Sequence, residues 1–415
     1  MNNKIKKLEV VIAGVDAGNT SVKLNFGDEQ TANYENIFVR RDKTNIEKDY
    51  QKQKNSDANI YNISKKLDVA VTMDLKDKND KVEFIFGDKS IAYRKSMTER
   101  KNGTKSDDKQ LVMNSLVALA NEIVKQNKDF WEENIEFDVD VIIGTGLPFK
   151  EHKIANKMEN YKNLFIGNHK IEFLDPSYPV KAVSLNVVDT YVEIEGFSAL
   201  RQTLFDKKVM QRGEDLEQKI CIMVDFGCYT VDIAGGIFYS DITDEGKEYI
   251  KFVPVDELSY GTDYGVGTAI DKTIDILEEE NIDVLGYHGA LYRKDVIEAS
   301  KKNETERLIK GNGINIDPFY TEECEKIGQD VAELLFDLID NNKFYGNVLE
   351  IYISGGGANI ESMVDRFKKY LIEEKHFNEN LFTVVEKPVF ANGKGYFNIA
   401  NANYRIKLRQ QEEKK

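Results

Sequence analysis

The chain has 415 residues, which is too long for one ordinary domain core, so we expect at least two domains that each fold unaided. It carries 72 acidic and 57 basic residues, a formal net charge of −15, and this acidity argues against broad direct binding to nucleic acid or acidic membranes. Hydrophobic residues make up 41% of the chain, and no apolar run approaches bilayer thickness, which is typical of a soluble globular protein.

Cysteine usage and the N-terminal sequence indicate the compartment. The three cysteines, Cys221, Cys228 and Cys324, have no CxxC spacing, which favours a reducing cytoplasm over a disulfide framework. The first residues lead into a strand pattern without a small-residue cleavage site, so no secretory signal is predicted. The four histidines are scattered, and their spacing does not indicate a zinc or iron site. We therefore expect a cytoplasmic protein.

The first half of the chain alternates strand and helix patterns. A strand over 8–15 enters a β-hairpin that ends near Gly27, and the polar, lysine-rich stretch 41–66 is expected to be a solvated insertion, either a loop-rich lobe or a disordered segment. Helical spacing of apolar residues predicts a helix over 110–128, followed by a buried strand over 139–144 and a glycine turn over 144–148. Further strands are predicted at 36–40, 67–74, 82–86, 171–174 and 182–188. This order is typical of an α/β protein.

The second half repeats this pattern, with a hairpin over 220–238 and a strand over 250–255. A glycine turn over 261–265 then begins a helix over 266–280, and such a turn offers free backbone amides to an anion. An amphipathic helix is predicted over 322–339 and a strand over 349–353. Three glycines over 355–357 precede a helix over 360–374 and would let a flat ring lie against the backbone. The last strand-like segment is 388–399.

One motif occurs twice in the chain. The sequence Val-Asp-Ala-Gly-Asn-Thr-Ser-Val-Lys at 15–23 returns as Val-Asp-Phe-Gly-Cys-Tyr-Thr-Val-Asp at 224–232. Each copy predicts a hairpin whose tip exposes backbone N–H groups, which form an anion-binding nest, and a carboxylate beside them can hold Mg²⁺ through water. The two copies could clamp a phosphate chain from both sides, with Asp16 and Asp225 facing one another across an interdomain cleft as water-mediated magnesium ligands.

These patterns define a set of candidate site residues. Lys23 either directs its ammonium group to a β- or γ-phosphate or faces solvent, and Asp232 either supports the metal through its water shell or is an ordinary hairpin residue. The candidate catalytic residues are Asp16, Asp225 and Glu195. The candidate nucleotide-binding residues lie in the two hairpins and two glycine turns: Gly18, Asn19, Thr20, Ser21, Lys23, Gly227, Cys228, Tyr229, Thr230, Gly261, Thr262, Gly355, Gly356, Gly357 and Asn359.

Glu195 is the candidate for positioning an attacking water, because phosphoryl transfer to water depends on an oriented nucleophile rather than on a covalent group. Glu193 is the alternative, and the choice depends on where the following helix begins. Either residue could instead be an exposed glutamate at a helix N-terminus.

Taken together, Asp-x-Gly-x-x-x-x-Lys at 16–23, Asp-x-Gly-x-x-Thr-x-Asp at 225–232 and Ser-Gly-Gly-Gly-Ala-Asn at 354–359 resemble the phosphate-1, phosphate-2 and adenosine motifs of the actin superfamily. They span nearly the whole chain. The stretch 191–200 resembles the connecting helix in which actin's glutamine orients the attacking water, and ParM-type bacterial actins carry a glutamate at the position of Glu195. The segments 146–149 and 353–358 also resemble ParM-type proteins. Cys228 and Tyr229 depart from the pattern, since these loop positions are usually small.

The resemblance implies a two-domain α/β fold of the actin-like, duplicated ribonuclease H-like kind, with ATP and Mg²⁺ bound in an interdomain cleft and GTP as a possible alternative nucleotide. Domain I would span 1–196 with 390–415 returning to it, and domain II would span 197–389. It further implies an ATPase that assembles head to tail into filaments and segregates plasmid DNA, with centromere DNA reached only indirectly through an adaptor of the ParR type, and with no membrane partner.

Two other functions share the same motifs. A small-molecule kinase for sugars or carboxylates would use the same cleft, but the sequence shows no convincing acceptor motif. A chaperone-like ATPase would need a C-terminal peptide-binding module, for which the chain leaves no room.

Overall fold

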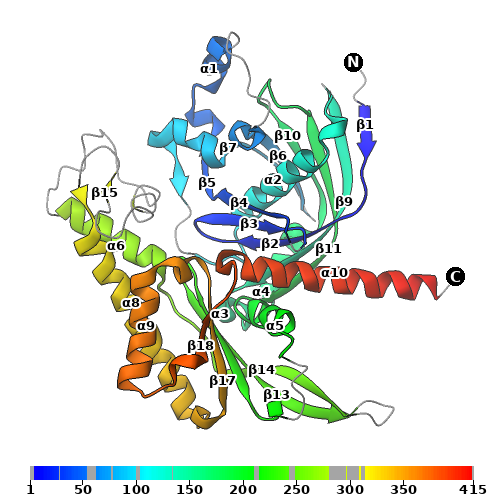
Figure 1. The fold of residues 1–415 in the computed structure, drawn as a ribbon. Helices are drawn as coiled ribbons and strands as arrows, with labels where there is room; N and C mark the ends of the chain where they lie inside the picture. The colour runs from blue at the N-terminus through cyan, green and yellow to red at the C-terminus, as the bar shows by residue number, and fades with distance from the viewer. Residues whose placement is uncertain are drawn as a thin grey trace. The chain divides into compact units, whose positions relative to one another are not determined.

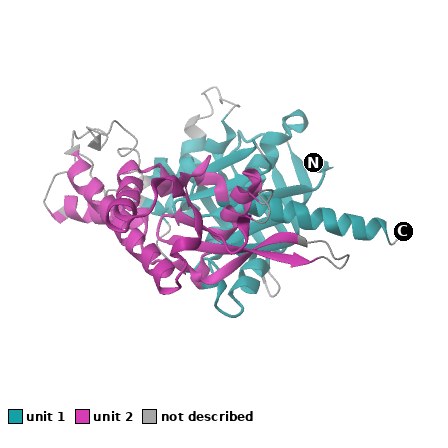
Figure 2. Cartoon of the chain, turned by 60° about the horizontal axis from the view of Figure 1, so that its bottom comes forward, with its two compact units in different colours: residues 1–147, 151–194, 392–415 teal, residues 148–150, 195–391 magenta. Residues whose placement is uncertain are grey.

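The computed structural model of the chain describes residues 4–27, 29–53, 62–75, 78–99, 103–132, 134–209, 215–242, 248–279, 296, 308–309 and 314–413. The chain separates into two units, shown in Figure 2. Unit 1 contains residues 1–147, 151–194 and 392–415, so both ends of the chain contribute to it, and unit 2 contains residues 148–150 and 195–391. Each unit has its own buried apolar core.

Unit 1 is built on a mixed sheet with the described strand order β4-β3-β2-β9-β11-β10-β6-β7-β5-β8, and β1 pairs with β9 (Figure 1). Its strands are β1 (Lys4–Lys7), β2 (Val11–Ala17), β3 (Ser21–Asn25), β4 (Thr31–Glu35), β5 (Ile37–Arg40), β6 (Asp68–Leu75), β7 (Lys78–Phe86), β8 (Thr98–Glu99), β9 (Ile135–Leu147), β10 (Gly167–Phe173) and β11 (Ala182–Ile194). All five single strands predicted for this half lie within these elements or overlap them. The predicted strand over 8–15 overlaps β2 from residue 11 onward, whereas residues 8–10 are not strand. They join β2 to β1 at a one-residue irregularity in the pairing with β9, since Lys7 pairs with Asp138 and Val11 with Val141.

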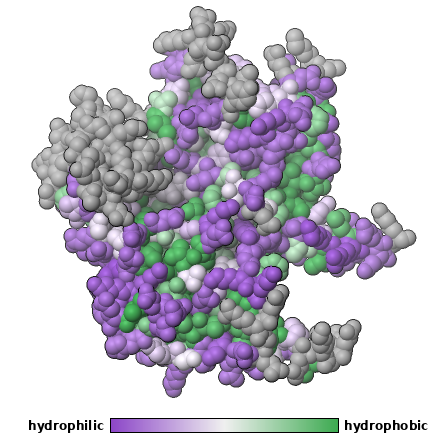
Figure 3. Space-filling view, in the orientation of Figure 1, coloured by the Kyte–Doolittle hydropathy of each residue, from purple (hydrophilic) through white to green (hydrophobic). Residues whose placement is uncertain are grey.

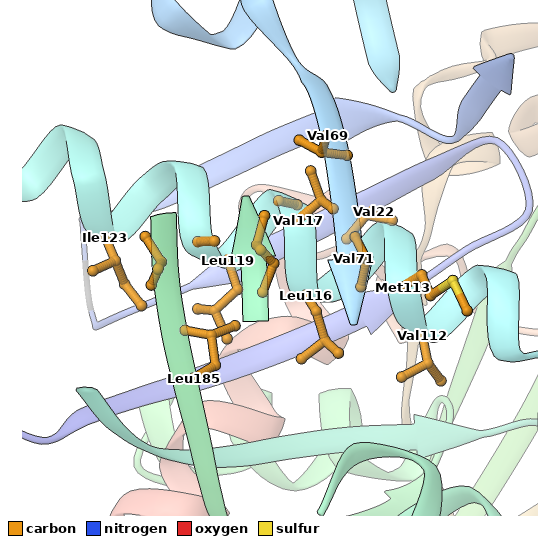
Figure 4. Close-up of a cluster of buried hydrophobic side chains, with 14 of the residues drawn as sticks. Val22, Val69, Val71, Val112, Met113, Leu116, Val117, Leu119, Ile123 and Leu185 are labelled. Atoms are coloured by element: carbon orange, nitrogen blue, oxygen red, sulfur yellow. The ribbon is translucent and has the colours of Figure 1, made fainter. Parts of the chain in front are cut away.

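Helix α2 (Lys109–Gln126) covers one face of this sheet and confirms the predicted helix. Asp108 caps its N-terminus by accepting a hydrogen bond from the Leu111 N–H (2.9 Å). Figure 4 shows the apolar side chains of α2 among those of the strands, with Val22, Val69, Val71 and Leu185 labelled. The other helices of this part of the chain are α1 (Ile46–Gln53), α3 (Phe149–His152), α4 (Lys157–Phe165) and α10 (Ala391–Glu412), with shorter 3₁₀ segments at Arg41–Lys43, Ile63–Lys66, Gly87–Ser96 and Lys128–Phe130.

Unit 2 contains a smaller sheet with the order β14-β13-β12-β17-β18. Its strands are β12 (Ile220–Phe226), β13 (Val231–Ile242), β14 (Glu248–Gly261), β17 (Val348–Ser354) and β18 (Phe382–Val384), with a separate pair β15 (Leu308–Ile309) and β16 (Ile314–Asn315). Its helices are α5 (Phe197–Asp206), α6 (Val266–Glu279), α8 (Asp317–Asn341) and α9 (Glu361–Lys369), with short helical segments at Tyr345–Asn347, Gly356–Asn359, Tyr370–Glu374, Glu379–Leu381 and Pro388–Phe390. The predicted helices and strands of the second half, apart from 388–399, are therefore confirmed.

The two sheets share one five-strand topology. In unit 1, β4-β3-β2-β9-β11 pair antiparallel, antiparallel, parallel and parallel. In unit 2, β14-β13-β12-β17-β18 pair in the same directions and in the same order. Each sheet therefore begins with a three-strand meander and continues with two parallel strands, and the predicted duplicated α/β fold class is confirmed.

Two sequence predictions are wrong, those for residues 388–399 and 144–148. The segment 388–399 is not a strand: Pro388–Phe390 is a short 3₁₀ segment, and residues 391–399 are the start of the 22-residue helix α10. The glycine turn expected over 144–148 is instead the end of β9, which runs to Leu147. Both differences have one cause, the contact between α10 and the strands: a Cβ on Gly14 would lie 2.0 Å from Gly393 O, and one on Gly144 would lie 2.0 Å from Tyr396 O. These glycines let the helix backbone approach the sheet.

In the polar stretch 41–66, the described residues form α1 and two 3₁₀ segments, and residues 54–61 lie outside the described part of the chain. Arg41 and Tyr50 both bind the buried carboxylate of Asp68, at 3.3 and 2.8 Å, so this region is attached to β6. No helix among the described residues is long and apolar enough to cross a membrane. Hydrophilic side chains predominate on the face of the molecule shown in Figure 3.

Candidate functional site

Hairpin 1, formed by β2 and β3, places the first motif at the end of the large sheet. Asp16 and Lys23 are direct cross-strand partners, and Lys23 Nζ lies 3.0 Å from Asp16 Oδ2. The two side chains are only 9% and 15% exposed. Lys23 is therefore not a solvent-facing lysine, because its ammonium group lies beside the carboxylate that the sequence indicated as a magnesium ligand.

The tip of hairpin 1 requires glycine at position 18. The Gly18 N–H donates to Ser21 O (2.9 Å), and a Cβ on Gly18 would lie 2.9 Å from the same oxygen. Any side chain at this position would therefore open the turn. The tip residues Asn19 and Thr20 follow directly and are partly exposed.

Hairpin 2, formed by β12 and β13, repeats this geometry in unit 2. Asp225 and Asp232 are direct cross-strand partners, seven residues apart like Asp16 and Lys23, and they are 7% and 2% exposed. Asp232 accepts hydrogen bonds from Thr230 Oγ1 (2.9 Å) and from the Phe149 N–H (3.3 Å). A Cβ on Gly227 would lie 2.6 Å from Thr230 O, the same conflict that Gly18 avoids with Ser21.

The tip of hairpin 2 is attached to the first turn of α6. The carbonyls of Gly227 and Cys228 accept hydrogen bonds from the N–H groups of Val266 and Gly267, at 3.1 and 2.5 Å. Gly267 is needed here because a Cβ would lie 2.6 Å from Cys228 Sγ and 3.1 Å from the Tyr229 ring. The Tyr229 hydroxyl also donates to Asp271 on α6 (2.6 Å). Both unusual side chains of this loop therefore pack toward α6.

This attachment corrects one expectation from the sequence. The amides at the start of α6 were expected to be available to an anion, but those of Val266, Gly267 and Thr268 bond to carbonyls within unit 2, the last to Gly265 O at 2.9 Å. Thr262 is likewise engaged, since its hydroxyl accepts from the Val231 N–H (2.7 Å) and donates to Tyr264 O (2.6 Å). Gly261 lies beside hairpin 2, where its Cβ would be 3.1 Å from Asp232 Oδ1.

The three glycines after β17 differ in their surroundings. Gly355 has a φ of +86°, and a Cβ on it would lie 2.3 Å from Asp225 Oδ1. The glycine therefore lets this loop pack closely against Asp225 of hairpin 2. A Cβ on Gly357 would lie 2.7 Å from Phe226 Cβ inside the core. Gly356 and Asn359 are exposed, and a Cβ on Gly356 would meet no atom within 4 Å. Only Gly356 of the three therefore presents open backbone to a ligand.

Glu195 lies between β11 and α5, in the turn where unit 2 begins. It is 6% exposed, so the alternative of an exposed helix-terminal glutamate is wrong for this residue. The next residue, Gly196, has a φ of +76°, and a Cβ on it would lie 3.4 Å from Asp232 O and 3.8 Å from Asp232 Cβ. The turn that carries Glu195 thus packs against hairpin 2. Glu193 lies earlier, within β11 of unit 1, where it pairs with Gly146.

Two residues of these surroundings were not identified from the sequence. Asn36 donates hydrogen bonds to the tip of hairpin 1, and Ser354 pairs with Asp225 in the neighbouring strand. Ser354 is fully buried, and its hydroxyl has no hydrogen-bond partner among the described residues. Ser354 opens the Ser-Gly-Gly-Gly motif, which is a usable signal, whereas nothing in the local sequence distinguishes Asn36 from other asparagines.

Comparison with known proteins identifies the fold. No protein-family model matches the chain, and no curated protein is similar to it in sequence. Solved structures do match it over their full length. The actin-like protein Alp7A has a TM-score of 0.68 at 14% identity, covering 98% of this chain and 100% of that chain. A 15-stranded ParM filament from Clostridium botulinum gives 0.65 at 17% identity, covering 95% and 100%.

The chain has the actin-like fold of the ParM type. A third example is the Bacillus thuringiensis ParM with ATP, which has a TM-score of 0.57 at 18% identity and covers 96% of this chain and 99% of that chain. In this actin-like chain, the two segments that resemble the phosphate-1 and phosphate-2 motifs form hairpins 1 and 2, one in the repeated topology of each unit.

Proposed function

We propose that this actin-like chain is a Mg²⁺-dependent ATPase that assembles into filaments. The observation that carries the proposal is the repetition of one hairpin in both units. In each hairpin an aspartate faces a cross-strand partner seven residues later, and the turn contains a glycine at which a side chain would clash with the backbone. Hairpin tips of this kind present backbone amides to phosphate oxygens. A similar fold occurs in a ParM with ATP, which supports ATP as the nucleotide, with GTP as an alternative.

The surroundings of Asp225 suit a hydrated magnesium ion. Its neighbours are oxygen donors, namely Asp232 and the Ser354 hydroxyl, which is buried without a hydrogen-bond partner among the described residues. Magnesium prefers such ligands and retains much of its water. The described residues contain no cluster of three or more His, Cys, Asp or Glu side chains that could bind a metal directly. We therefore propose that Asp225, together with Asp16 of hairpin 1, binds Mg²⁺ through water, and the ion would supply charge neutralisation on the phosphates.

We assign water positioning to Glu195. Its turn packs against Asp232, and its burial would keep the carboxylate oriented toward a single bound water rather than bulk solvent. Lys23, now paired with Asp16, would contribute its charge to the phosphates once the metal neutralises that carboxylate. Gly18, Asn19, Thr20 and Ser21 would bind phosphate from hairpin 1, and Gly227, Cys228, Tyr229 and Thr230 would do so from hairpin 2.

The cellular role that we propose is plasmid segregation by head-to-tail filaments. Support comes from the ParM and Alp7A folds and from the filament of the Clostridium botulinum relative. The net charge of −15 disfavours direct contact with DNA, so a DNA-binding adaptor of the ParR type would connect the filament to centromere DNA.

Light scattering tests this proposal directly. Purified protein should show a rise in scattering and phosphate release after addition of ATP and Mg²⁺, and neither should occur when EDTA removes the metal. Electron microscopy of the same samples should show filaments. Phosphate transfer to an added sugar or carboxylate without any rise in scattering would instead identify a small-molecule kinase and refute the proposal.

A further inference from the structure

Asn36 donates two hydrogen bonds to the tip of hairpin 1. It lies between β4 and β5 and is 1% exposed. Its backbone N–H donates to Thr20 O (2.9 Å), and its side-chain Nδ2 donates to Gly18 O (2.7 Å). One buried residue therefore fixes the directions of two carbonyl groups in a four-residue turn.

Fixing these carbonyls also fixes two amides. In a trans peptide the C=O of one residue and the N–H of the next point in opposite directions. Because Gly18 O and Thr20 O point toward Asn36, the N–H groups of Asn19 and Ser21 point to the opposite side of the tip. Two parallel amides on that side form the concave donor set that binds an anion.

The Asn36 side chain is itself held in one orientation. Its Oδ1 accepts a hydrogen bond from Asn114 Nδ2 (2.6 Å), which leaves Nδ2 to face Gly18. Asn114 lies on α2 and is 1% exposed, and its own Oδ1 accepts from Gln110 Nε2 (2.8 Å). Three side-chain amides therefore connect the first turns of α2 to the hairpin tip. Outer residues of this kind commonly fix the geometry of a binding group.

Hairpin 2 also has carbonyls held from outside its tip, by different residues and only partly at the same positions. Two of its tip carbonyls, Gly227 O and Cys228 O, accept from the first amides of α6 instead of from an asparagine. Gly227 O corresponds to Gly18 O, so this carbonyl is held in both hairpins, by a helix amide in one and by an asparagine side chain in the other. We propose that Asn36 is a positioning residue that orients the phosphate-binding amides of hairpin 1, an inference that rests on the nucleotide-binding function proposed above.

The test is Mg–ATP affinity of the full-length Asn36→Asp variant, measured by calorimetry between pH 6 and pH 8. At pH 8 the aspartate places a charged oxygen against Gly18 O, and we expect affinity to fall about tenfold or more. At pH 6 the deficit should shrink, because a protonated carboxyl group can donate to that carbonyl again. Asn45→Asp is the matched control, since it makes the same change at an exposed asparagine before α1 and should bind like the wild type.

The Asn114→Ala variant leaves Asn36 in place but releases its side-chain amide, and we expect affinity to fall about threefold. If Asn36→Asp does not fold, as judged by circular dichroism, the affinity of Asn114→Ala becomes the test of the positioning role of Asn36. Wild-type affinity in the folded Asn36→Asp protein at every pH, or in Asn114→Ala where only that variant folds, would overturn the positioning role alone. Failure of the wild-type protein to bind Mg–ATP would overturn the proposed function and this inference together.

Discussion

Two neighbouring glycines offer a test of whether the adenosine ring of ATP binds over residues 355–357, as the resemblance to the actin superfamily implies. We expect Gly356→Ala to leave folding unchanged, because its new Cβ meets no atom within 4 Å, yet to weaken ATP binding about tenfold, or about 1.4 kcal/mol. The methyl group would separate the ring from the backbone on which we expect it to lie. Calorimetric titration with ATP measures the affinity, and thermal melting followed by circular dichroism measures the folding.

Gly355→Ala is the matched control, and unlike Gly356→Ala we expect it to destabilise the fold. Its φ of +86° costs an alanine about 1–2 kcal/mol. The new Cβ would lie 2.3 Å from Asp225 Oδ1, whereas ordinary contacts begin at 3.4 Å, so about 1.1 Å of displacement is required (3.4 − 2.3). We expect about 3 kcal/mol of destabilisation in total and a melting temperature lower by about 6–12 °C. Wild-type ATP affinity in Gly356→Ala would refute the location of the ring, and unchanged melting of Gly355→Ala would refute the packing argument.

Three further predictions concern catalysis and pH. Glu195→Ala should lower kcat at least about tenfold while nucleotide affinity stays within about twofold, because water positioning matters mainly in the transition state; hydrolysis at the parental rate would exclude this role. Asp225→Asn should abolish Mg²⁺-dependent phosphate release, and full activity in a coupled assay would contradict the metal assignment. Burial lowers the pKa of His169 from 6.5. The free energy of unfolding should therefore fall as the pH drops below 6.5 and become constant below the folded-state pKa. The slope of this fall is at most about 1.4 kcal/mol per pH unit. Urea titrations from pH 7 to pH 5 measure this slope, which should flatten in His169→Gln; an equal slope in both proteins would show that another group is responsible.

The hairpins could be predicted because their determinants are local. Asp16 and Lys23 are seven residues apart, and the glycine that closes the turn lies between them. The periodicity of α2 was equally informative, since its apolar positions are buried along the whole helix. Features of this kind depend on residues within one or two turns of chain, which is the range over which sequence pattern and structure correspond most closely.

The remaining features depend on distant contacts. Residues 388–399 carry β-branched, aromatic, glycine and asparagine residues that disfavour a helix, but α10 forms because Gly393 and Tyr396 pack against glycines of β2 and β9. The role of Asn36 depends on a hydrogen bond to Gly18, eighteen residues away, and on Asn114, seventy-eight residues away. The prediction for the amides at the start of α6 was wrong largely for the same reason, because the acceptors of Val266 and Gly267 lie in hairpin 2.

The contact between Gly14 and Gly393 has a consequence for synthesis, since the two residues are 379 positions apart (393 − 14). During translation, all of unit 2 leaves the ribosome before the residues of α10 that complete unit 1. A chain that stops before residue 391 lacks α10, in which a Cβ on Gly393 would lie 4.0 Å from Asp16 Cβ. Hairpin 1 therefore gains this contact only after α10 has been made, and under the proposed function we expect prematurely terminated chains to be impaired in nucleotide-driven assembly.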